Sequence, residues 1–168
     1  MDWAETISDS LKKSGISFIS YVPDISIHQV TKLLEADPYF RVVPATREEE
    51  AIGIAAGAYA VGRRSAIFMQ SSGLGNCINA IGSLCIVCRL PIPMFINVRG
   101  ELGEFNIAQV PMGRATRPVL DAIGVRHYTL ENLASLSDMV DGALDLCYAS
   151  REPIALCLSP LLHRGSLA

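Results

Sequence analysis

The sequence predicts a single doubly wound α/β domain, in which helices cover both faces of a mainly parallel, six-stranded sheet. Short apolar runs rich in β-branched residues alternate with helical patterns along the 168 residues, which is the rhythm of consecutive βαβ units. The runs at residues 66–69 and 93–97 are apolar almost throughout, as expected of strands covered on both faces. No repeat or linker-like stretch interrupts the pattern, so residues 1–168 are predicted to form one domain.

Six strands are expected where the apolar and β-branched residues cluster. In chain order they cover residues 16–22, 40–43, 65–70, 94–98, 125–128 and 154–158. Six helices are expected around them, at residues 3–14, 28–35, 48–61, 76–87, 117–123 and 130–149. Ligands of such sheets bind beyond the carboxyl ends of the strands. Four loops are therefore expected to converge, at residues 21–24, 44–48, 70–76 and 97–104.

Composition excludes several classes of protein. Half of the residues are apolar, which is enough for a core without disulfides or metals. A net charge of −3 without any Lys/Arg block gives no electrostatic footprint for nucleic acid or an anionic membrane. No apolar run approaches the roughly 20 residues of a membrane span. Five cysteines without a regular framework, and a start without a basic and apolar leader, predict a cytoplasmic protein.

No metal site is expected within this chain. Cys85 and Cys88 form a lone Cys-x-x-Cys, whereas a zinc site needs about four ligands. These two cysteines are interpreted as buried thiols on a core helix. The three histidines, His28, His127 and His163, are far apart in the sequence.

Three consecutive carboxylates, Glu48, Glu49 and Glu50, precede a segment rich in Ala, Gly and Ile. Thr46 is a candidate cap for this helix, with Glu49 at the capping-box spacing, and acidic side chains suit the positive end of the helix dipole. From residue 51 every face of the helix is apolar or small. At least one carboxylate is therefore expected to point into a protein-lined space, where loss of hydration suits such a group to proton chemistry. Periodicity does not choose among the three.

The segment Gln70–Asn79 is predicted to form a tight glycine turn that exposes backbone N–H groups between a strand and a helix. It lacks the dinucleotide fingerprint, because Ile78 stands where the third glycine belongs. A Gly-Lys-Ser/Thr phosphate loop is also absent from the sequence. Nicotinamide and P-loop sites are therefore not expected.

Several short motifs occur together in this sequence. They are Arg47-Glu48, Gly53-Ile54-Ala55-x-Gly57, Met69-Gln-Ser-Ser-Gly-Leu-Gly-Asn76, Ala80-x-x-Ser83-Leu84 and Arg99-Gly-Glu-x-Gly103. With these motifs the chain resembles the pyrimidine-binding domain of thiamine diphosphate enzymes of the 2-oxoacid decarboxylase group. Within that group it most resembles the phosphonopyruvate decarboxylases and, more closely, the separate α subunits of the sulfopyruvate decarboxylases.

The resemblance implies a role for one of the three glutamates. In this family a buried glutamate hydrogen-bonds N1′ of the aminopyrimidine ring of thiamine diphosphate and thereby promotes removal of the thiazolium C2 proton. The 2-oxoacid then loses CO2 and leaves as an aldehyde, here sulfoacetaldehyde from 3-sulfopyruvate. The family spacing to Gly57 selects Glu48 rather than Glu49. Ser72, Gly73 and Asn76 are the implied cofactor-binding residues.

Four further residues are candidates for substrate contacts, and each has a structural alternative. Asp24 follows the first strand, but it is also a candidate cap for the next helix. Ser71 is equally suited to satisfying the backbone of the turn. Arg47 and Arg99 are suited to clamp a sulfonate or phosphonate. The alternative for Arg99 is an ion pair with Glu101 or Glu104.

Part of the family's active site is missing from this sequence. The Gly-Asp-Gly motif, with an Asn some thirty residues later, holds the diphosphate and Mg²⁺ in the family, but the only Asp-Gly here is Asp141-Gly142, within a helical pattern. The resemblance therefore implies an oligomer in which a β subunit holds Mg²⁺ and shares the thiamine diphosphate. This chain alone would be inactive or weakly active. The alternatives are a phosphonopyruvate decarboxylase, an acetolactate synthase-like subunit, or a non-catalytic α/β binding module.

Overall fold

In the computed structural model, which describes residues 2–163, six strands form one parallel sheet in the order β2-β1-β3-β4-β6-β5. All five neighbouring pairs are parallel, which confirms the predicted fold class. The strands are β1 (Phe18–Tyr21), β2 (Arg41–Pro44), β3 (Ser65–Gln70), β4 (Pro93–Asn97), β5 (Arg126–Leu130) and β6 (Ile154–Leu158).

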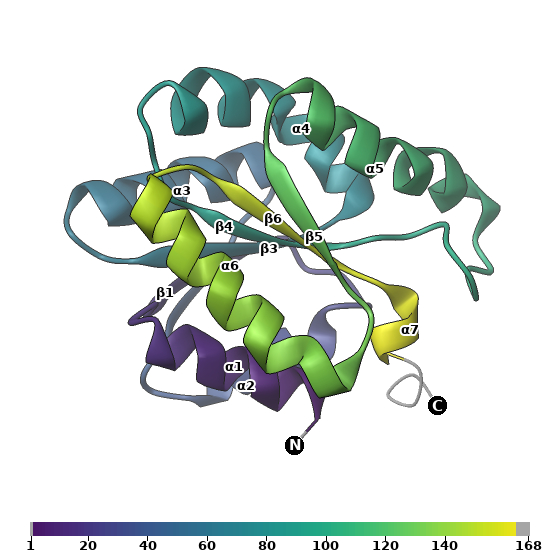
Figure 1. Cartoon of the computed structure of the whole chain (residues 1–168), viewed down its shortest axis with the longest axis horizontal. Helices are drawn as coiled ribbons and strands as arrows, with labels where there is room; N and C mark the ends of the chain where they lie inside the picture. Colours follow the sequence, from purple (N-terminus) through teal and green to yellow (C-terminus); the bar gives the residue numbers. More distant parts are fainter. Residues whose placement is uncertain (1, 164–168) are drawn as a thin grey trace.

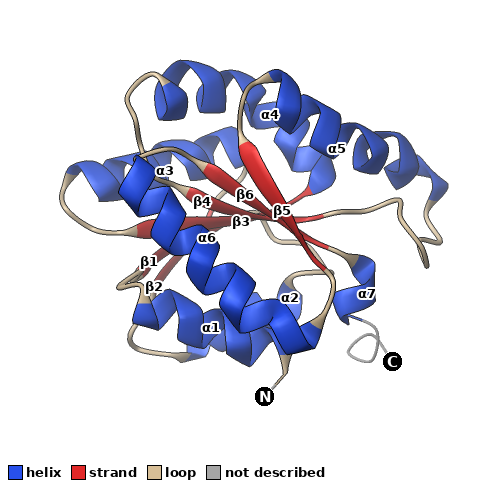
Figure 2. Ribbon diagram, in the orientation of Figure 1, coloured by secondary structure: helices blue, strands red, loops and turns tan. Residues whose placement is uncertain are grey.

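Helices cover both faces of the sheet (Figures 1 and 2). One layer contains α1 (Trp3–Lys13), α2 (His28–Ala36) and α6 (Leu136–Ser150), and the other contains α3 (Glu48–Ala60), α4 (Ser71–Ala80) and α5 (Val110–Ala122). Short elements complete the fold, namely the π-helical η1 (Ile81–Ile86), the 3-10 helices η2 (Ile107–Gln109) and η3 (Leu133–Ser135), and α7 (Pro160–His163).

The strand order explains how the helices divide between the two layers. The connections from β1 to β2 and from β5 to β6 run one way along the sheet, whereas the other three run the opposite way. Because parallel crossovers are right-handed, opposite directions place their helices on opposite faces. Accordingly α2 and α6 share one layer, and α3, α4 and α5 share the other. The direction reverses beside β1 and β3, which is where ligands of such sheets usually bind.

The core consists of one apolar cluster on each side of the sheet. All residues of β4 and β6 are buried, as the unbroken apolar runs predicted. Phe68 on β3 and Phe95 on β4 are both fully buried, and their rings stack with centroids 4.6 Å apart. The two central strands therefore form a rigid base for the loops at their carboxyl ends.

The predicted strands agree with the structure to within two residues at each end, but three helix starts differ. The predicted helix at 117–123 begins at Val110, because Pro111 lies in the first turn, where its missing N–H costs no hydrogen bond. The last long helix begins at Leu136, since β5 continues to Leu130. The helix predicted from residue 76 begins at Ser71.

The early start of α4 makes the predicted glycine turn wrong. Residues 71–76 form the first turns of a helix that follows β3 directly. Neither Gly73 nor Gly75 has a positive φ, so these glycines do not serve a turn. They instead allow close packing, since a Cβ on Gly75 would lie 3.1 Å from Cε of Met112 on α5.

The capping box predicted for α3 is also wrong. The helix begins at Glu48 with Arg47 as its N-cap residue, and no side chain caps it. This places Glu50, not Glu49, at the third helical position. The Glu50 carboxylate folds back and accepts a hydrogen bond from the backbone N of Thr46 at 2.7 Å. Thr46 therefore takes part in this hydrogen bond through its backbone N–H, and its hydroxyl does not cap the helix.

The described residues contain no cluster of three or more His, Cys, Asp or Glu side chains arranged to hold a metal ion; the side chain of His163 lies outside this description. Over the same residues, no helix combines the length and apolar character needed to cross a membrane.

Burial raises the pKa of the Cys85 thiol to about 12. Cys88 is exposed beyond the end of η1, so the expectation of two buried thiols is wrong for it. Asp141 lies in α6 and pairs with Lys13 at 2.5 Å.

The start of α5 packs directly on the loop that follows β4. A Cβ added to Gly113 would lie 1.6 Å from the carbonyl oxygen of Arg99. We expect Gly113→Ala to lower the free energy of unfolding by about 2 to 3 kcal/mol, because backbone atoms must move apart. Chemical denaturation measures this change.

The matched control is Gly142→Ala on α6, where no atom lies within 4 Å of an added Cβ. This substitution is expected to leave the free energy of unfolding unchanged or to raise it by up to about 1 kcal/mol, as Ala is the better helix former. Equal stabilities of Gly113→Ala and the wild type would contradict the close packing.

Candidate functional site

The loops at the carboxyl ends of the strands converge, as predicted. Nδ2 of Asn76 donates to Oε2 of Glu48 at 3.1 Å, and the backbone N of Arg99 donates to Oγ of Ser71 at 3.2 Å. Nδ2 of Asn97 donates to Oγ of Ser26 at 2.6 Å. These bonds join the segments that follow β1, β2, β3 and β4 into one continuous polar edge.

Glu48 is the buried member of the three glutamates. It is only 7% exposed, whereas Glu49 and Glu50 are exposed. The structure therefore makes a distinction that helical periodicity did not. Because Glu48 is the first residue of α3, its carboxylate also lies at the positive end of that helix dipole.

Two residues of α4 surround the Glu48 carboxylate. Asn76 provides the hydrogen bond to Oε2, and a Cβ added to Gly73 would lie 2.3 Å from Oε1. We call these three residues, Glu48, Gly73 and Asn76, the glutamate site. The neighbouring Cys77 points into the core, where burial raises the pKa of its thiol to about 12 and the negative charge of Glu48 acts in the same direction. Cys77 is therefore not an activated nucleophile.

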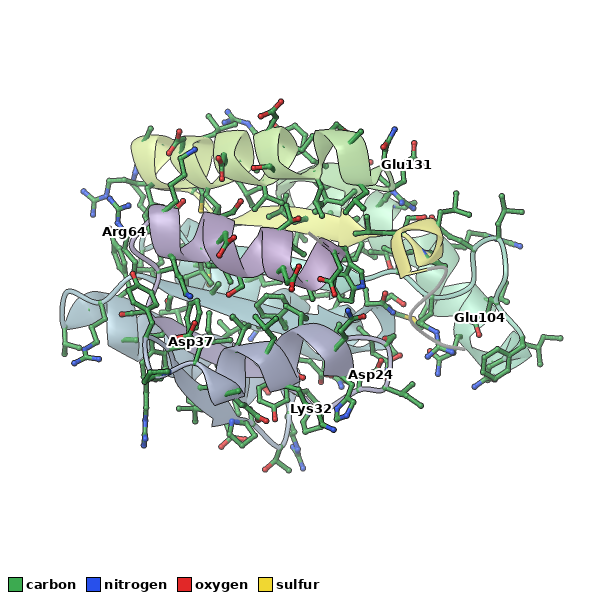
Figure 3. The ribbon with its side chains drawn as sticks, turned by 90° about the horizontal axis from the view of Figure 1, so that it is seen from below. Asp24, Lys32, Asp37, Arg64, Glu104 and Glu131 are labelled. Atoms are coloured by element: carbon green, nitrogen blue, oxygen red, sulfur yellow. The ribbon has the colours of Figure 1, made fainter. Side chains whose placement is uncertain are left out.

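A second feature of the same edge is a cavity of about 250 Å³, which we call the strand-end pocket. Its lining residues come from the segments after β1, β4 and β6. They are Ile25, Ser26, Asn97, Arg99, Gly103, Glu104, Phe105 and Pro160. Figure 3 shows Asp24 and Glu104 toward the end of the molecule where α7 lies, and Arg64 at the opposite end.

Arg99 and Glu104 form a bidentate ion pair within this pocket. Nε of Arg99 donates to Oε2 of Glu104 at 2.6 Å, and Nη2 donates to Oε1 at 2.9 Å. Glu104 also accepts bonds from the backbone N–H groups of Gly100, Phe105 and Asn106. The guanidinium and the N–H groups of Asn106 and Gly100 lower the pKa of Glu104 to about 2. The ion-pair alternative for Arg99 is thus present, with Glu104 as the partner, while Glu101 pairs with Arg117 at 2.5 Å.

Asp24 stabilises the loop after β1 and does not cap α2. Its Oδ1 accepts hydrogen bonds from the backbone N of Ser26 at 2.9 Å and from the Ser26 hydroxyl. The N-cap residue of α2 is Ile27, without a side-chain cap. The hydrogen bond with Glu104 is the main cause of the raised pKa of the Arg99 guanidinium, and the negative charge of Asp24 acts in the same direction. Asp24 and Arg99 therefore share one electrostatic environment.

The remaining candidate residues differ in burial. Ser71 is fully buried, and its hydroxyl connects the start of α4 to the loop after β4. Ser72 is half-buried on the first turn of α4, and Arg47 is exposed at the start of α3. The structure thus brings Glu48, Gly73 and Asn76 into contact, whereas the side chain of Arg47 forms no hydrogen bond or ion pair with another described residue.

The sequence interpretation did not include Ser26 and Asn97 among the candidate site residues, although the sequence pattern around Asn97 indicated a special role. It is a polar residue at the end of an otherwise apolar strand, and it is 1% exposed. Gln70 occupies the equivalent position on β3, in register with Asn97. Its Oε1 is buried without a hydrogen-bond partner among the described residues. Such an acceptor at the strand ends is available to a ligand that donates a hydrogen bond.

The lowered pKa of Glu104 predicts an acid-dependent stability. Because this pKa lies below the usual 4.5, the unfolded carboxylate binds more protons than the folded one at acidic pH. The contribution of Glu104 is therefore fully present above about pH 5 and is lost as the pH falls toward 2. We expect Glu104→Gln to lower the free energy of unfolding at neutral pH by about 1 to 3 kcal/mol.

This difference should shrink as the pH falls from 5 to 2.5, which denaturant titrations of the wild type and Glu104→Gln at several pH values measure. Glu131→Gln, at an exposed carboxylate, is the control. A difference between Glu104→Gln and the wild type that is independent of pH would contradict the charge-assisted pairing of Glu104.

Comparisons with known proteins agree with this geometry. Subunit alpha of sulfopyruvate decarboxylase from Methanothermobacter thermautotrophicus is 38% identical over 94% of this chain and 96% of that protein. The subunit of the same name from Methanocaldococcus jannaschii is 41% identical over 92% of each chain. Sulfopyruvate decarboxylase from Methanosarcina acetivorans is 33% identical over 96% of this chain, which spans only 41% of that longer protein.

A solved structure shows the same fold. It is a 2-oxoglutarate:ferredoxin oxidoreductase from Magnetococcus marinus, with a TM-score of 0.74 and 15% sequence identity over 96% of this chain and 29% of that chain. The family model described as thiamine pyrophosphate enzyme, N-terminal TPP binding domain, matches residues 1–99. The chain therefore belongs to the thiamine pyrophosphate enzymes and, within them, to the group of proteins named sulfopyruvate decarboxylase subunit alpha.

Proposed function

We propose that this chain is the α subunit of a two-chain, thiamine diphosphate-dependent decarboxylase that converts 3-sulfopyruvate into sulfoacetaldehyde and CO2. The observation that carries the proposal is the buried Glu48 carboxylate, held by Asn76 at the carboxyl edge of the sheet. The names of the relatives supply the substrate and the subunit type.

The glutamate site fits the aminopyrimidine end of thiamine diphosphate. Glu48 supplies a carboxylate acceptor. Because Gly73 has no side chain, there is space for that carboxylate beside α4. When bound, the cofactor supplies the carbon nucleophile and the electron sink that decarboxylation of a 2-oxoacid requires. The proposed role of Glu48 is to hold a proton at N1′ of the pyrimidine ring, while Asn76 orients the carboxylate. Ser72 is proposed to line the cofactor site beside them.

A partner chain is proposed to complete the site. This sequence has no Gly-Asp-Gly motif, so we assign the diphosphate and Mg²⁺ to a β subunit. The name subunit alpha and the longer protein from M. acetivorans support a second component. The five free thiols are consistent with the cytoplasm as the compartment.

Two exposed surfaces suit contact with this partner. Near the strand-end pocket, four large apolar side chains are 73 to 92% exposed, namely Ile25, Leu102, Phe105 and Ile107. The loop that carries three of them projects beyond the strand ends (Figure 1). Exposed apolar groups of this kind mark interaction sites.

The second surface is on α3. Nothing lies within 4 Å of a Cβ added to Gly53 or Gly57, which allows another helix to approach closely.

The strand-end pocket is the proposed substrate site. Glu104 occupies Nε and Nη2 of Arg99, which leaves Nη1 as a donor for a sulfonate oxygen. Asp24 is proposed to lie near the reacting carbon, and Ser71 to hold the loop that carries Arg99. Arg47, exposed at the start of α3, is proposed to attract the anionic substrate from solvent.

Reconstitution tests the proposal as a whole. The chain is purified alone and together with a β chain that carries Gly-Asp-Gly and a downstream Asn. The release of CO2 from 3-sulfopyruvate, phosphonopyruvate and pyruvate is then measured with Mg²⁺ and thiamine diphosphate present. We expect activity only with both chains and the highest kcat/KM for 3-sulfopyruvate. Absence of activity and of cofactor binding with such a partner would overturn the proposal. A higher kcat/KM for phosphonopyruvate than for 3-sulfopyruvate would overturn the proposed substrate.

Glu48→Gln tests the role of the carboxylate. We expect exchange of the cofactor C2 proton in the assembled enzyme to slow by about 10² to 10⁴-fold, because an amide does not share a proton as a carboxyl group does. Exchange into D2O, followed by NMR of acid-quenched cofactor, measures the rate. Glu49→Gln, at an exposed carboxylate, is the control and should exchange at the wild-type rate. An unaltered rate in Glu48→Gln would remove the role from Glu48.

Phe105→Asp tests the proposed partner surface. Phe105 is 92% exposed, so its substitution should not alter the melting temperature of the isolated chain. We expect affinity for the β chain to fall at least about tenfold, since a charge would replace an aromatic side chain that the proposed interface buries. Analytical ultracentrifugation of the mixed chains measures this. Leu133→Asp, at a half-exposed position before α6, is the control, and equal affinities of the two variants would argue against the surface.

A further inference from the structure

Gly73 stands out because a side chain there would occupy the position of Glu48. A Cβ built on Gly73 would lie 2.3 Å from Oε1, 2.4 Å from Cδ and 2.4 Å from Cγ of Glu48. Three atoms of one side chain are thus closer than van der Waals contact allows. Gly73 lies in α4 without a positive φ, so its backbone conformation is open to alanine. The glycine is therefore explained by the space it leaves and not by its conformational freedom.

The same face of α4 provides both restraints on Glu48. Asn76 follows Gly73 by three residues, which places the two on one side of the helix. The hydrogen bond from Asn76 holds Oε2, while the bare backbone at Gly73 admits Oε1. Glu48 is 7% exposed, so its carboxylate is enclosed in this position. Removing the space at Gly73 must therefore displace the carboxylate from Asn76.

We propose that Gly73 is a positioning residue that sets the location of the Glu48 carboxylate and acts on the reaction only through it. The inference rests on the proposed function for its catalytic consequence, but the displacement of Glu48 follows from the geometry alone. The alternative role for Gly73 is a direct contact with the cofactor. In that case Glu48 would stay in place when Gly73 is substituted.

The test is Gly73→Ala in the assembled two-chain enzyme, with C2 proton exchange and the dissociation constant for thiamine diphosphate measured separately. We expect exchange to slow about 10 to 100-fold, as for a catalytic group displaced by about 1 Å, with assembly unchanged. Gly82→Ala in η1 is the matched control, because nothing lies within 4 Å of its added Cβ. Exchange in Gly73→Ala within twofold of the wild type would overturn the proposal.

Double variants separate this role from an independent effect. If Gly73 acts only through Glu48, Gly73→Ala adds no further loss of exchange in a Glu48→Gln background, and losses that multiply would contradict the proposal.

A crystal structure of Gly73→Ala distinguishes failure of this proposal from failure of the proposed function. The Glu48 carboxylate should move away from residue 73, and its hydrogen bond with Asn76 should be lost, whether or not the protein is an enzyme. A carboxylate that stays in place would overturn the positioning role. Equal exchange in the wild type and Glu48→Gln would instead remove the proposed function and leave the geometric result standing.

Discussion

The placement of one carboxylate between the first turns of two neighbouring helices is the constraint on which the candidate site depends. Burying a charged group is costly unless it is hydrogen-bonded or faces positive charge. Here Glu48 begins α3, beside the first turns of α4, so both helix dipoles present their positive ends near it. The hydrogen bond from Asn76 adds a specific partner. The parallel sheet makes this possible, because the helices that follow β2 and β3 both begin at its carboxyl edge.

The glutamate site and the strand-end pocket are physically coupled through the start of α4. The backbone of Arg99 is bonded to Ser71, which lies two residues before Gly73 on the same helix. The ion pair between Arg99 and Glu104 orders the loop that lines the pocket. The same loop carries the exposed apolar side chains of Leu102, Phe105 and Ile107. In the proposed assembly, one polar edge thus serves the cofactor, the substrate and the partner chain.

Much of the fold followed from local sequence patterns, whereas the errors arose where tertiary packing set the role of a residue. The runs at 65–70 and 154–158 predicted β3 and β6 to the residue, because strands buried on both faces leave an unbroken apolar signal. Gly73 was predicted to lie in a turn, but it lies in α4, where the side chain of Glu48 approaches its backbone closely. Glu48 is distant from Gly73 in the sequence, so a local sequence pattern does not predict their contact.

The same limit applies to charged residues. Spacing left Glu101 and Glu104 as equal partners for Arg99, and the fold selects Glu104 while Arg117 pairs with Glu101. Helical periodicity left Glu48, Glu49 and Glu50 equivalent, and burial separates Glu48 from the others. The family resemblance selected the same residue from its distance to Gly57, so two independent observations agree on Glu48.

A crystal structure of the assembled α and β chains with thiamine diphosphate and Mg²⁺ tests the central claim most directly. The account predicts that a carboxylate oxygen of Glu48 lies within hydrogen-bond distance, about 2.6 to 3.2 Å, of the pyrimidine N1′ atom. A pyrimidine ring that contacts Glu49, or no carboxylate of this chain, would contradict it.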